Sequence, residues 1–277
     1  MPELPEVETV RRGLNNLVRG QKIMSVKLNY QRMIQSDLAE FLSYLPGKEI
    51  INIGRRGKYL LFELSEKTLI SHLRMEGKYH LFPTQALPIN KHFHAFFDLS
   101  NGQTLVYQDV RKFGTMELVD NLNLETFFNS KKLGPEPVAS DFLLAPFQDK
   151  LMHSQKKIKP FLLEQSLVVG LGNIYVDEAL WLAKIHPSEL AKNLSPNDVS
   201  VLRKSIINVL AAGVERGGST IRSYKNAFGV AGNMQDYLNV YGKKSQPCPV
   251  CGTAIEKYKL AGRGTHFCPT CQKLKKT

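Results

Sequence analysis

The chain has 277 residues, enough for two domains or for one large domain with a well-buried core. Its hydrophobic content of 43% and charged content of 22% are those of a soluble globular protein. The sequence contains no run of about 18 apolar residues and it begins with acidic residues, which excludes a membrane-spanning helix and a secretory signal peptide.

The chain is strongly basic, with a formal net charge of +12 at pH 7. This balance indicates a polyanion as partner, with phosphate contacts that make binding depend on salt. A membrane surface is the competing polyanion, but the sequence offers no apolar segment to enter one. We therefore expect a protein of the cytoplasm.

The first eight residues, MPELPEVE, combine an amine with carboxylates. Removal of Met1 leaves the secondary amine of Pro2 as the new N-terminus, and an α-amino group titrates near pH 8, about 2.5 units below a lysine. A neutral amine can attack an electrophilic carbon and form an iminium, as in Schiff-base catalysis. Three carboxylates lie within one or two helical turns of this amine, those of Glu3, Glu6 and Glu8. The alternative is an ordinary helix start with acidic residues at the positive end of its dipole, and this stretch alone favours it.

Apolar residues at helical spacing from Val7 to Val18 predict a first helix, which Gly20 closes. From Gln21 to about Val119 the pattern changes to short β-type runs, which predict an antiparallel sandwich. The clearest runs are 50–53 and 59–62 around a basic turn at 54–58, then 68–73, and then 93–99 and 104–108 joined by an Asn-Gly hairpin turn.

Residues 120–139 lose periodicity and end in Leu-Gly-Pro-Glu-Pro, a pattern typical of a linker. The following stretch, to Gly217, is helical in pattern. Ser195, Pro196 and Asp198 predict the start of one helix through an N-cap and a first-turn proline, and Gly217-Gly218 ends it. Residues 219–240 are polar with scattered glycines and are too long for a tight connection, so we expect a binding loop there.

The four cysteines occur as two Cys-x-x-Cys pairs near the C-terminus, separated by residues 252–267. This is the spacing of a tetrahedral zinc site formed by two knuckles joined by a hairpin. The predicted ligands are Cys248, Cys251, Cys268 and Cys271. Four protein ligands leave no open position for substrate, so we expect one structural zinc ion. The hairpin carries Arg263 between two glycines, which suits a phosphate contact, although a solvated basic turn is the alternative.

Residues 170–178, GLGNIYVDE, predict a glycine-containing turn that opens a helix. Backbone N–H groups at a helix start form a ready phosphate site, to which Asn173 adds a donor. Lys159 offers a cation nearby in the sequence.

Two further stretches, HLRMEG at 72–77 and DVRKFG at 109–114, place an apolar side chain beside cations at a strand end. A protein needs this combination to push a wedge into a base stack while it holds the DNA backbone. The alternative is that Met75 and Phe113 are core residues, and composition alone favours that alternative.

Six motifs, in this order along the chain, resemble those of bacterial formamidopyrimidine-DNA glycosylase: PELPEVET at 2–9, RGK at 56–58, HLRMEG at 72–77, DVRKFG at 109–114, GNIY at 172–175, and AGRGTH at 261–266 with its cysteines. The resemblance implies an α+β multidomain fold with DNA across a cleft. Its parts are a catalytic helix and antiparallel β-sandwich at 1–119, a linker at 120–139, a helix–two-turn–helix DNA-binding domain with a lesion-capping loop at 140–240, and a four-cysteine zinc finger at 241–277.

The resemblance also implies roles for matching residues. Pro2 is the nucleophile on the sugar C1′, and Glu3 is the acid that assists base departure and ring opening. Lys58 lies at the lesion sugar and helps the elimination steps, and Arg263 grips the phosphates and assists the second elimination. Further DNA contacts are implied at His72, His92, Arg111, Lys159, Asn173 and Tyr241.

The remaining implied residues act on the flipped nucleotide. Met75, Arg111 and Phe113 fill the gap that it leaves, and Arg111 pairs with the orphaned cytosine. The loop that closes over the extruded base corresponds to Ser219, Thr220, Ile221, Arg222, Ser223 and Tyr224.

The implied activity is that of a base-excision-repair DNA glycosylase with AP lyase activity. It removes 8-oxoguanine and formamidopyrimidines from duplex DNA through a Schiff base at Pro2, and cuts the strand by β- and δ-elimination. The expected partner is double-stranded DNA with an oxidised purine or an abasic site, and the expected protein is a monomer at the bacterial nucleoid.

Two alternatives remain open. An endonuclease VIII-like glycosylase for oxidised pyrimidines shares the N-terminal proline, but Leu4 and the gap-filling set favour the oxidised-purine class. A non-catalytic zinc-finger DNA-binding protein explains the charge and the cysteines, but leaves Pro2, Glu3 and Lys58 as coincidence.

Overall fold

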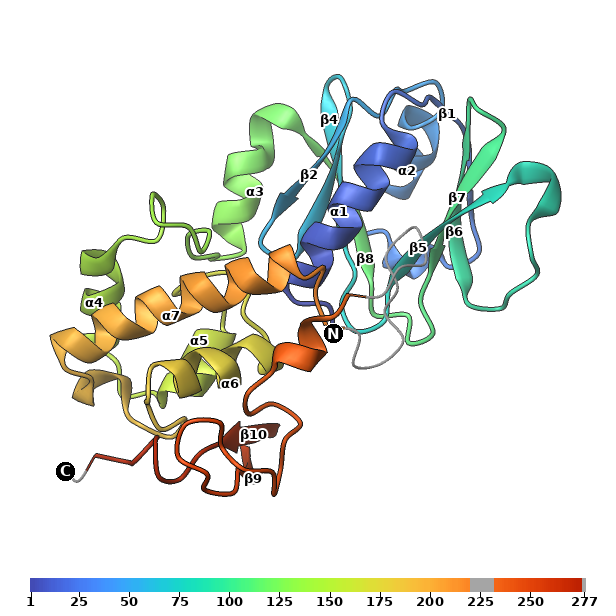
Figure 1. Cartoon of the computed structure of the whole chain (residues 1–277). Helices are drawn as coiled ribbons and strands as arrows, with labels where there is room; N and C mark the ends of the chain where they lie inside the picture. The colour runs from blue at the N-terminus through green and yellow to red at the C-terminus, as the bar shows by residue number, and fades with distance from the viewer. Residues whose placement is uncertain (220–231, 276–277) are drawn as a thin grey trace. The chain divides into compact units, whose positions relative to one another are not determined.

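The computed structural model describes residues 1–219 and 232–275 (Figure 1). These residues form two compact units, one of residues 1–2 and 6–131 and the other of residues 3–5, 132–219 and 232–275. Each unit has a hydrophobic core of its own.

Helix α1 (Leu4–Val18), which confirms the predicted first helix, belongs to the first unit from Glu6 onward. Val7, Val10, Leu14 and Val18 are buried along one stripe of this helix and belong to the core of the unit. Burying each of these side chains contributes roughly 1.5–3 kcal/mol. The stripe therefore attaches α1 to the strands that follow it.

Two four-stranded antiparallel sheets complete this unit, which confirms the predicted antiparallel sandwich. One has the order β1 (Ile23–Leu28), β6 (Phe93–Leu99), β7 (Gln103–Gln108), β5 (Lys78–Pro83). The other has the order β2 (Asn52–Arg56), β3 (Tyr59–Glu63), β4 (Lys67–His72), β8 (Thr115–Asp120). Helix α2 (Leu38–Tyr44) and 3-10 turns at Gln31–Met33 and Thr84–Ala86 lie between strands.

The basic turn predicted at 54–58 is shorter than expected. Strand β2 continues to Arg56, which pairs with Tyr59, so only Gly57 and Lys58 form the turn. Gly57 has φ 55°, and a two-residue hairpin turn requires such left-handed backbone. Lys58 is consequently held at the tip of a paired hairpin.

The predicted linker at 120–139 contains regular structure, contrary to expectation. A 3-10 turn at Asn121–Asn123 leads into helix α3 (Leu124–Ser130), and the division between the two units falls after Lys131. Two helical turns are too short to show a hydrophobic period, and α3 has no side-chain N-cap, so the sequence carried no signal for it.

The second unit is mainly helical, with α4 (Leu144–Met152), α5 (Ile158–Leu163), α6 (Asn173–Leu182) and α7 (Pro196–Glu215). Helix α7 starts with the predicted cap, because the Ser195 hydroxyl accepts the Asp198 N–H and Asp198 accepts the Ser195 N–H in return. Short 3-10 turns lie at Ala191–Asn193, before α7, and at Met234–Tyr237, after it. Strands β9 (Glu256–Leu260) and β10 (Arg263–Phe267) form the C-terminal hairpin.

Helix α6 is the centre of this unit, since it contacts α5, α7 and β10. Seven of its ten residues, from Tyr175 to Trp181, are buried, and they include two carboxylates. No helix in the described ranges is long and apolar enough to cross a membrane.

Candidate active site

Glu3 is bound by the first turn of α6. Its carboxylate accepts the backbone N–H groups of Gly172 at 2.6 Å, Ile174 at 2.9 Å and Tyr175 at 3.3 Å. The first N–H groups of a helix have no partner within the helix and carry its positive dipole end, so they stabilise a carboxylate. Glu3 is only 3% exposed, and this site holds it in one place.

The expectation that these N–H groups bind phosphate was wrong, because they already hold Glu3. Gly170 and Gly172 instead allow Glu3 and Leu4 to pack close to this backbone. A Cβ atom at Gly172 would lie 2.3 Å from Cδ of Glu3, and one at Gly170 would lie 2.5 Å from Cδ1 of Leu4. The Leu4 N–H also donates to the Gly170 carbonyl at 3.0 Å. Pro2 is thus joined directly to Glu3, and Glu3 and Leu4 are both bound to the segment from Gly170 to Tyr175.

Glu8, the third carboxylate of the first stretch, has a structural role. Its oxygens lie 2.9 Å from the guanidinium nitrogens of Arg11 and Arg12 and 3.1 Å from that of Arg55. Burial opposes ionisation, but the hydrogen bonds from Arg11 and Arg12 prevail and lower the pKa of Glu8. Glu8 is therefore bound to three arginines, whereas Glu3 is bound to the first turn of α6.

Lys58 is 6% exposed, and its neighbour Tyr59 pairs with His72 across β3 and β4. Burial, and then the charges of Arg74 and Lys58, lower the pKa of His72 to about 3. Its Nδ1 atom accepts the N–H of Arg74 at 2.9 Å. His72 is therefore neutral and holds the start of the 72–77 loop; its contact with DNA stays a prediction, as does that of the half-buried His92.

The 109–114 loop is held by a carboxylate whose role the sequence did not reveal. Asp109 is 1% exposed; Oδ1 accepts the N–H of Arg111 at 2.9 Å, and Oδ2 accepts those of Phe113 at 3.0 Å and Gly114 at 2.8 Å. An aspartate side chain often accepts the backbone N–H two residues later and so stabilises a turn. The position of Asp109 at the start of the 109–114 loop could therefore have predicted this role.

Tyr107 is the point where both candidate wedge loops meet. A Cβ atom would lie 2.3 Å from the Tyr107 hydroxyl at Gly77 and 1.6 Å from it at Gly114, so only glycine fits at these positions. Tyr107 is 1% exposed, and its ring contacts that of Tyr79 edge-on. The 72–77 and 109–114 loops are therefore supported by the same buried side chain.

The three candidate gap-filling residues lie outside the core. Phe113 is 52% exposed, Arg111 is exposed and Met75 is half-buried. The Arg111 guanidinium lies 4.7 Å from the centre of the Phe113 ring, in cation–π geometry. The core assignment that composition favoured for Phe113 and Met75 is therefore wrong.

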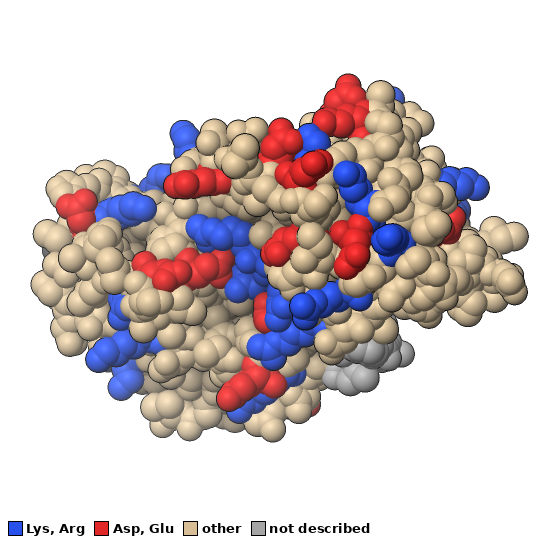
Figure 2. All heavy atoms as spheres, turned by 90° about the horizontal axis from the view of Figure 1, so that it is seen from above, with Lys and Arg blue, Asp and Glu red and all other residues tan. Residues whose placement is uncertain are grey.

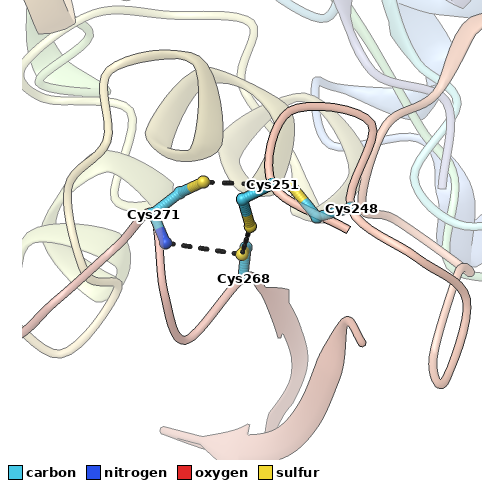
Figure 3. A group of neighbouring side chains, drawn as sticks. All are labelled: Cys248, Cys251, Cys268 and Cys271. Atoms are coloured by element: carbon cyan, nitrogen blue, oxygen red, sulfur yellow. Dashed lines mark hydrogen bonds between the residues drawn. The ribbon is translucent and has the colours of Figure 1, made fainter. Parts of the chain in front are cut away.

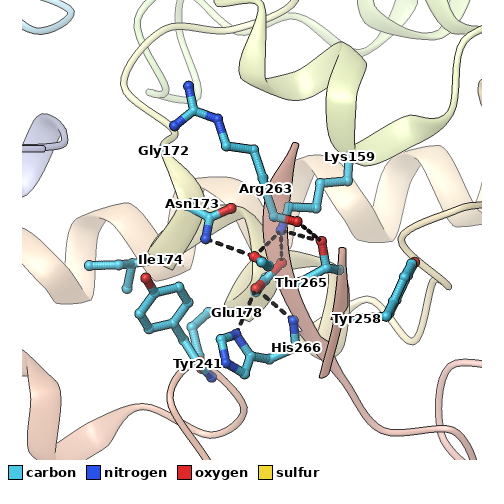
Figure 4. Close-up of polar contacts among 12 residues, drawn as sticks. Lys159, Gly172, Asn173, Ile174, Glu178, Tyr241, Tyr258, Arg263, Thr265 and His266 are labelled. Atoms are coloured by element: carbon cyan, nitrogen blue, oxygen red, sulfur yellow. Dashed lines mark hydrogen bonds and ion pairs between the residues drawn. The ribbon is translucent and has the colours of Figure 1, made fainter. Parts of the chain in front are cut away.

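In the second unit, Lys159 is the centre of a buried polar network (Figure 4). It is 1% exposed; its ammonium lies 2.7 Å from Asp177 and donates to the Gly264 carbonyl at 3.1 Å and the Thr265 hydroxyl at 2.9 Å. Burial lowers the pKa of Lys159, and Asp177 opposes this shift. A direct phosphate contact would require the ammonium to leave these partners, and that contact stays a prediction.

Three residues that are expected to contact DNA, Asn173, Arg263 and Tyr241, adjoin this buried network. The Asn173 side chain donates to the Gly264 carbonyl at 2.9 Å, and Arg263 is exposed and extends away from the buried group (Figure 4). Glu178 is 1% exposed and accepts the N–H groups of Asn239, Val240 and Tyr241, each at 2.9 Å.

Asp177 and Glu178 had no predicted role. A signal was present, since two adjacent acids occur inside the otherwise apolar run from Ile174 to Leu182. Carboxylates on a buried helix face need specific partners, so such a pair predicts that other segments of the chain dock against it.

The four cysteine thiols lie together, as the Cys-x-x-Cys spacing predicted (Figure 3). Their sulfur atoms are all within 4.8 Å of one another, with 3.9 Å between Cys248 and Cys271 and 3.4 Å between Cys251 and Cys268. A zinc ion bound by four thiolates at about 2.3 Å places its ligands about 3.8 Å apart. The cluster therefore fits a zinc ion.

Of the predicted lesion loop, Ser219 is described and buried, whereas Thr220, Ile221, Arg222, Ser223 and Tyr224 lie outside the described residues. The whole chain has 37 Lys and Arg against 25 Asp and Glu, and Figure 2 shows Lys and Arg side chains at many points of one face. This charge suits a polyanionic partner.

Three family models match the chain. They describe the formamidopyrimidine-DNA glycosylase N-terminal domain (residues 1–116), the H2TH domain of that enzyme (133–225), and the zinc finger found in FPG and IleRS (245–274). Formamidopyrimidine-DNA glycosylases of Streptococcus pyogenes serotype M28 and Streptococcus mutans serotype c are 58% and 56% identical over 273 residues, with at least 99% of each chain covered.

The chain is also similar to solved structures. A Lactococcus lactis FPG mutant bound to Fapy-dG DNA superposes with a TM-score of 0.95 at 51% identity, covering 98% of this chain and all of that one. MutM bound to DNA containing carbocyclic 8-oxo-G gives 0.93 at 52%, with 98% and 100% covered. The Lactococcus lactis Fpg complex with abasic-site DNA gives 0.93 at 51%, with 98% and 99% covered.

Proposed function

Because this chain belongs to the formamidopyrimidine-DNA glycosylase family, we propose that it excises 8-oxoguanine and formamidopyrimidines from duplex DNA and then cleaves the strand at the resulting site. The family consists of DNA glycosylases with AP lyase activity. The solved relatives are complexes with DNA that carries Fapy-dG, an 8-oxo-G analogue or an abasic site. Each of these corresponds to a substrate or an intermediate of the proposed reaction.

In the proposed reaction, the neutral nitrogen of Pro2 forms a bond to C1′ of the lesion sugar. The bond between C1′ and the base breaks, and the base leaves with the electron pair and takes up a proton. After attack, the nitrogen of Pro2 loses its proton to the Glu3 carboxylate. The ring bond from C1′ to O4′ then opens, Glu3 passes this proton to O4′, and an iminium joins Pro2 to C1′. Loss of a C2′ proton expels the 3′ phosphate, loss of a C4′ proton expels the 5′ phosphate, and water releases the enzyme.

The placement of Glu3 supports this chemistry. Three backbone N–H groups orient its carboxylate, and the peptide bond to Pro2 keeps the two groups adjacent. A carboxylate that is fixed before substrate arrives can accept and return a proton without reorganisation during the reaction. Lys58 and Arg263 act at the lesion sugar and at its phosphates in this proposal.

DNA binding and base extrusion involve the other predicted residues. The DNA backbone is bound at His72, His92, Asn173 and Tyr241, and Arg111 pairs with the orphaned cytosine. Lys159 supports DNA binding from its buried position, through the Gly264 carbonyl and the Thr265 hydroxyl. Met75, Arg111 and Phe113 occupy the space of the extruded nucleotide, and their exposure on supported loops suits this role. The segment from Ser219 to Tyr224 covers the extruded base. Because its substrate is chromosomal DNA, the protein works at the nucleoid.

A single zinc ion bound by the four cysteines shapes the C-terminal hairpin and takes no part in the chemistry. Four thiolates complete its coordination, so it supplies structure rather than an open site. The cluster is packed against Trp181, Val240 and Ile255, which ties the zinc site to α6 and to the segment before Tyr241.

The docking of Glu3 beside Pro2 is the observation that carries this proposal. It is tested with duplex DNA containing 8-oxoguanine opposite cytosine, in the presence of borohydride. We expect a covalent protein–DNA adduct and, without borohydride, cleavage on both sides of the lesion. An adduct only with oxidised pyrimidines would favour the endonuclease VIII-like alternative, and binding without an adduct would favour a non-catalytic zinc-finger protein.

A further inference from the structure

A buried ion pair in the second unit has no part in the proposed chemistry. Lys159 is 1% exposed and Asp177 is fully buried, and their charged atoms are 2.7 Å apart. Burying two charges is costly unless their geometry is good and further hydrogen bonds satisfy them. The additional hydrogen bonds of the pair therefore indicate what it does.

All of these additional bonds go to one short stretch of β10. Lys159 donates to the Gly264 carbonyl and the Thr265 hydroxyl, and Asp177 accepts the N–H of His266 at 2.9 Å. The Lys159 ammonium thus has two hydrogen-bond acceptors in β10 besides its ion pair with Asp177. The pair thus holds three consecutive residues that follow Arg263 directly, of which Figure 4 shows Thr265 and His266.

Arg263 itself is at the surface, at the first position of β10 after a turn with two residues of positive φ, Ala261 at 45° and Gly262 at 77°. Ala261 and Gly262 themselves are exposed, but Leu260 before them is buried and pairs with Arg263 across the hairpin. On the C-terminal side of Arg263, Gly264 to His266 are bound by the buried pair. The β9–β10 pairing and the buried pair therefore fix the backbone of Arg263 together.

We propose that Lys159 and Asp177 are positioning residues for Arg263, and that they aim its guanidinium at the phosphates during the second elimination. This inference rests on the proposed function of Arg263. The pair contributes directional bonds to backbone and side-chain atoms, which apolar side chains of the same volume could not supply.

Three variants separate positioning from stability: Lys159→Met, Asp177→Asn and the double variant. Each single variant leaves a buried charge without its partner, so both should lower the melting temperature. The double variant removes both charges and should recover most of this loss. However, in the double variant the Gly264 carbonyl and the Thr265 hydroxyl still have no hydrogen bond from residue 159. The orientation of the Arg263 guanidinium should therefore not be restored.

The readout is the ratio of δ- to β-elimination products in single turnovers on abasic-site DNA, measured beside the rate of borohydride trapping. In the double variant we expect a larger fold-decrease in the δ-to-β ratio than in the trapping rate. The difference between the two fold-decreases should be on the order of a factor of ten. Arg263→Gln provides the scale for complete loss of the guanidinium.

A double variant with a recovered melting temperature and the wild-type product ratio would overturn the positioning role. So would a parallel loss of trapping and of both eliminations, which indicates a general effect on the fold. If Arg263→Gln itself leaves the ratio unchanged, the role proposed for Arg263 is wrong and the inference is wrong with it. If only Arg263→Gln changes the ratio, the function stands and the positioning role is overturned.

Discussion

Oδ2 of Asp109 accepts the backbone N–H of Phe113 at 3.0 Å, across four residues of one loop. The same buried carboxylate holds the N–H groups of Arg111 and Gly114. The 109–114 loop therefore has its shape in the free protein, with Phe113 at the surface and Arg111 against its ring. Loops organised before binding reduce the entropy lost on binding.

Replacement of Phe113 or Met75 by alanine tests the proposed wedge. Because neither side chain belongs to the core, each variant should change the free energy of unfolding by no more than about 0.5 kcal/mol. Cleavage of duplex DNA with 8-oxoguanine should fall much more than elimination at an abasic site, where no base has to be held out of the stack. Arg111→Ala should in addition weaken the discrimination between cytosine and adenine opposite the lesion.

Urea denaturation and single-turnover assays on both DNAs measure these effects. A core residue would behave differently, since its truncation costs roughly 2–5 kcal/mol. Such a loss, with both activities reduced in parallel, would contradict the wedge.

His72 should make the protein less stable in mild acid. Its pKa is lowered to about 3 in the folded state by burial and by the charges of Arg74 and Lys58. The unfolded chain therefore binds a proton below about pH 6.5 while the folded chain does not, and stability falls by roughly 1.4 kcal/mol per pH unit from this group. The loss continues until the pH approaches the folded pKa.

The variant His72→Asn retains an oxygen that can accept the Arg74 N–H but has no proton to gain. Relative to wild type, it should gain about 2 kcal/mol between about pH 6.5 and about pH 5. Urea denaturation at both pH values gives this difference, in which the contributions of the other histidines cancel. Parallel pH profiles would show that His72 is not the buried neutral group described above.

Pro2 should form the covalent adduct only when its amine is free. Pro2→Gly should still be trapped weakly by borohydride, since a primary amine remains, whereas retention or acetylation of Met1 should abolish trapping. Intact mass spectrometry establishes which N-terminus each preparation carries. Equal trapping by a preparation that retains Met1 would exclude Pro2 as the nucleophile.

Serine at any one of Cys248, Cys251, Cys268 or Cys271 should severely lower DNA affinity and leave the rest of the chain folded. The reason is that the hairpin bearing Arg263 depends on the metal, whereas the helical core of the second unit does not contain the cysteines. Metal analysis and DNA-binding titrations test this prediction. Folded, active wild-type protein without zinc would contradict it.

Signals between near neighbours in the sequence were sufficient for several features. The apolar stripe of α1, the hairpin turn at Asn101-Gly102, the Ser195 cap of α7 and the spacing of the four cysteines were all predicted. Each depends on a few adjacent residues, so backbone preference and ligand spacing determine it without the rest of the fold.

Other features depended on partners far away in the chain. The α6 N–H groups seemed suited to phosphate until the fold brought Glu3 to them from 169 residues away. Lys159 seemed a surface cation until the fold buried it beside Gly264, 105 residues later. Composition could not place Phe113, because an apolar side chain fits a core or a wedge equally well. Only the tertiary structure decides which groups lose water and with which partners they replace it, since burial is a property of the packed chain and not of any local stretch.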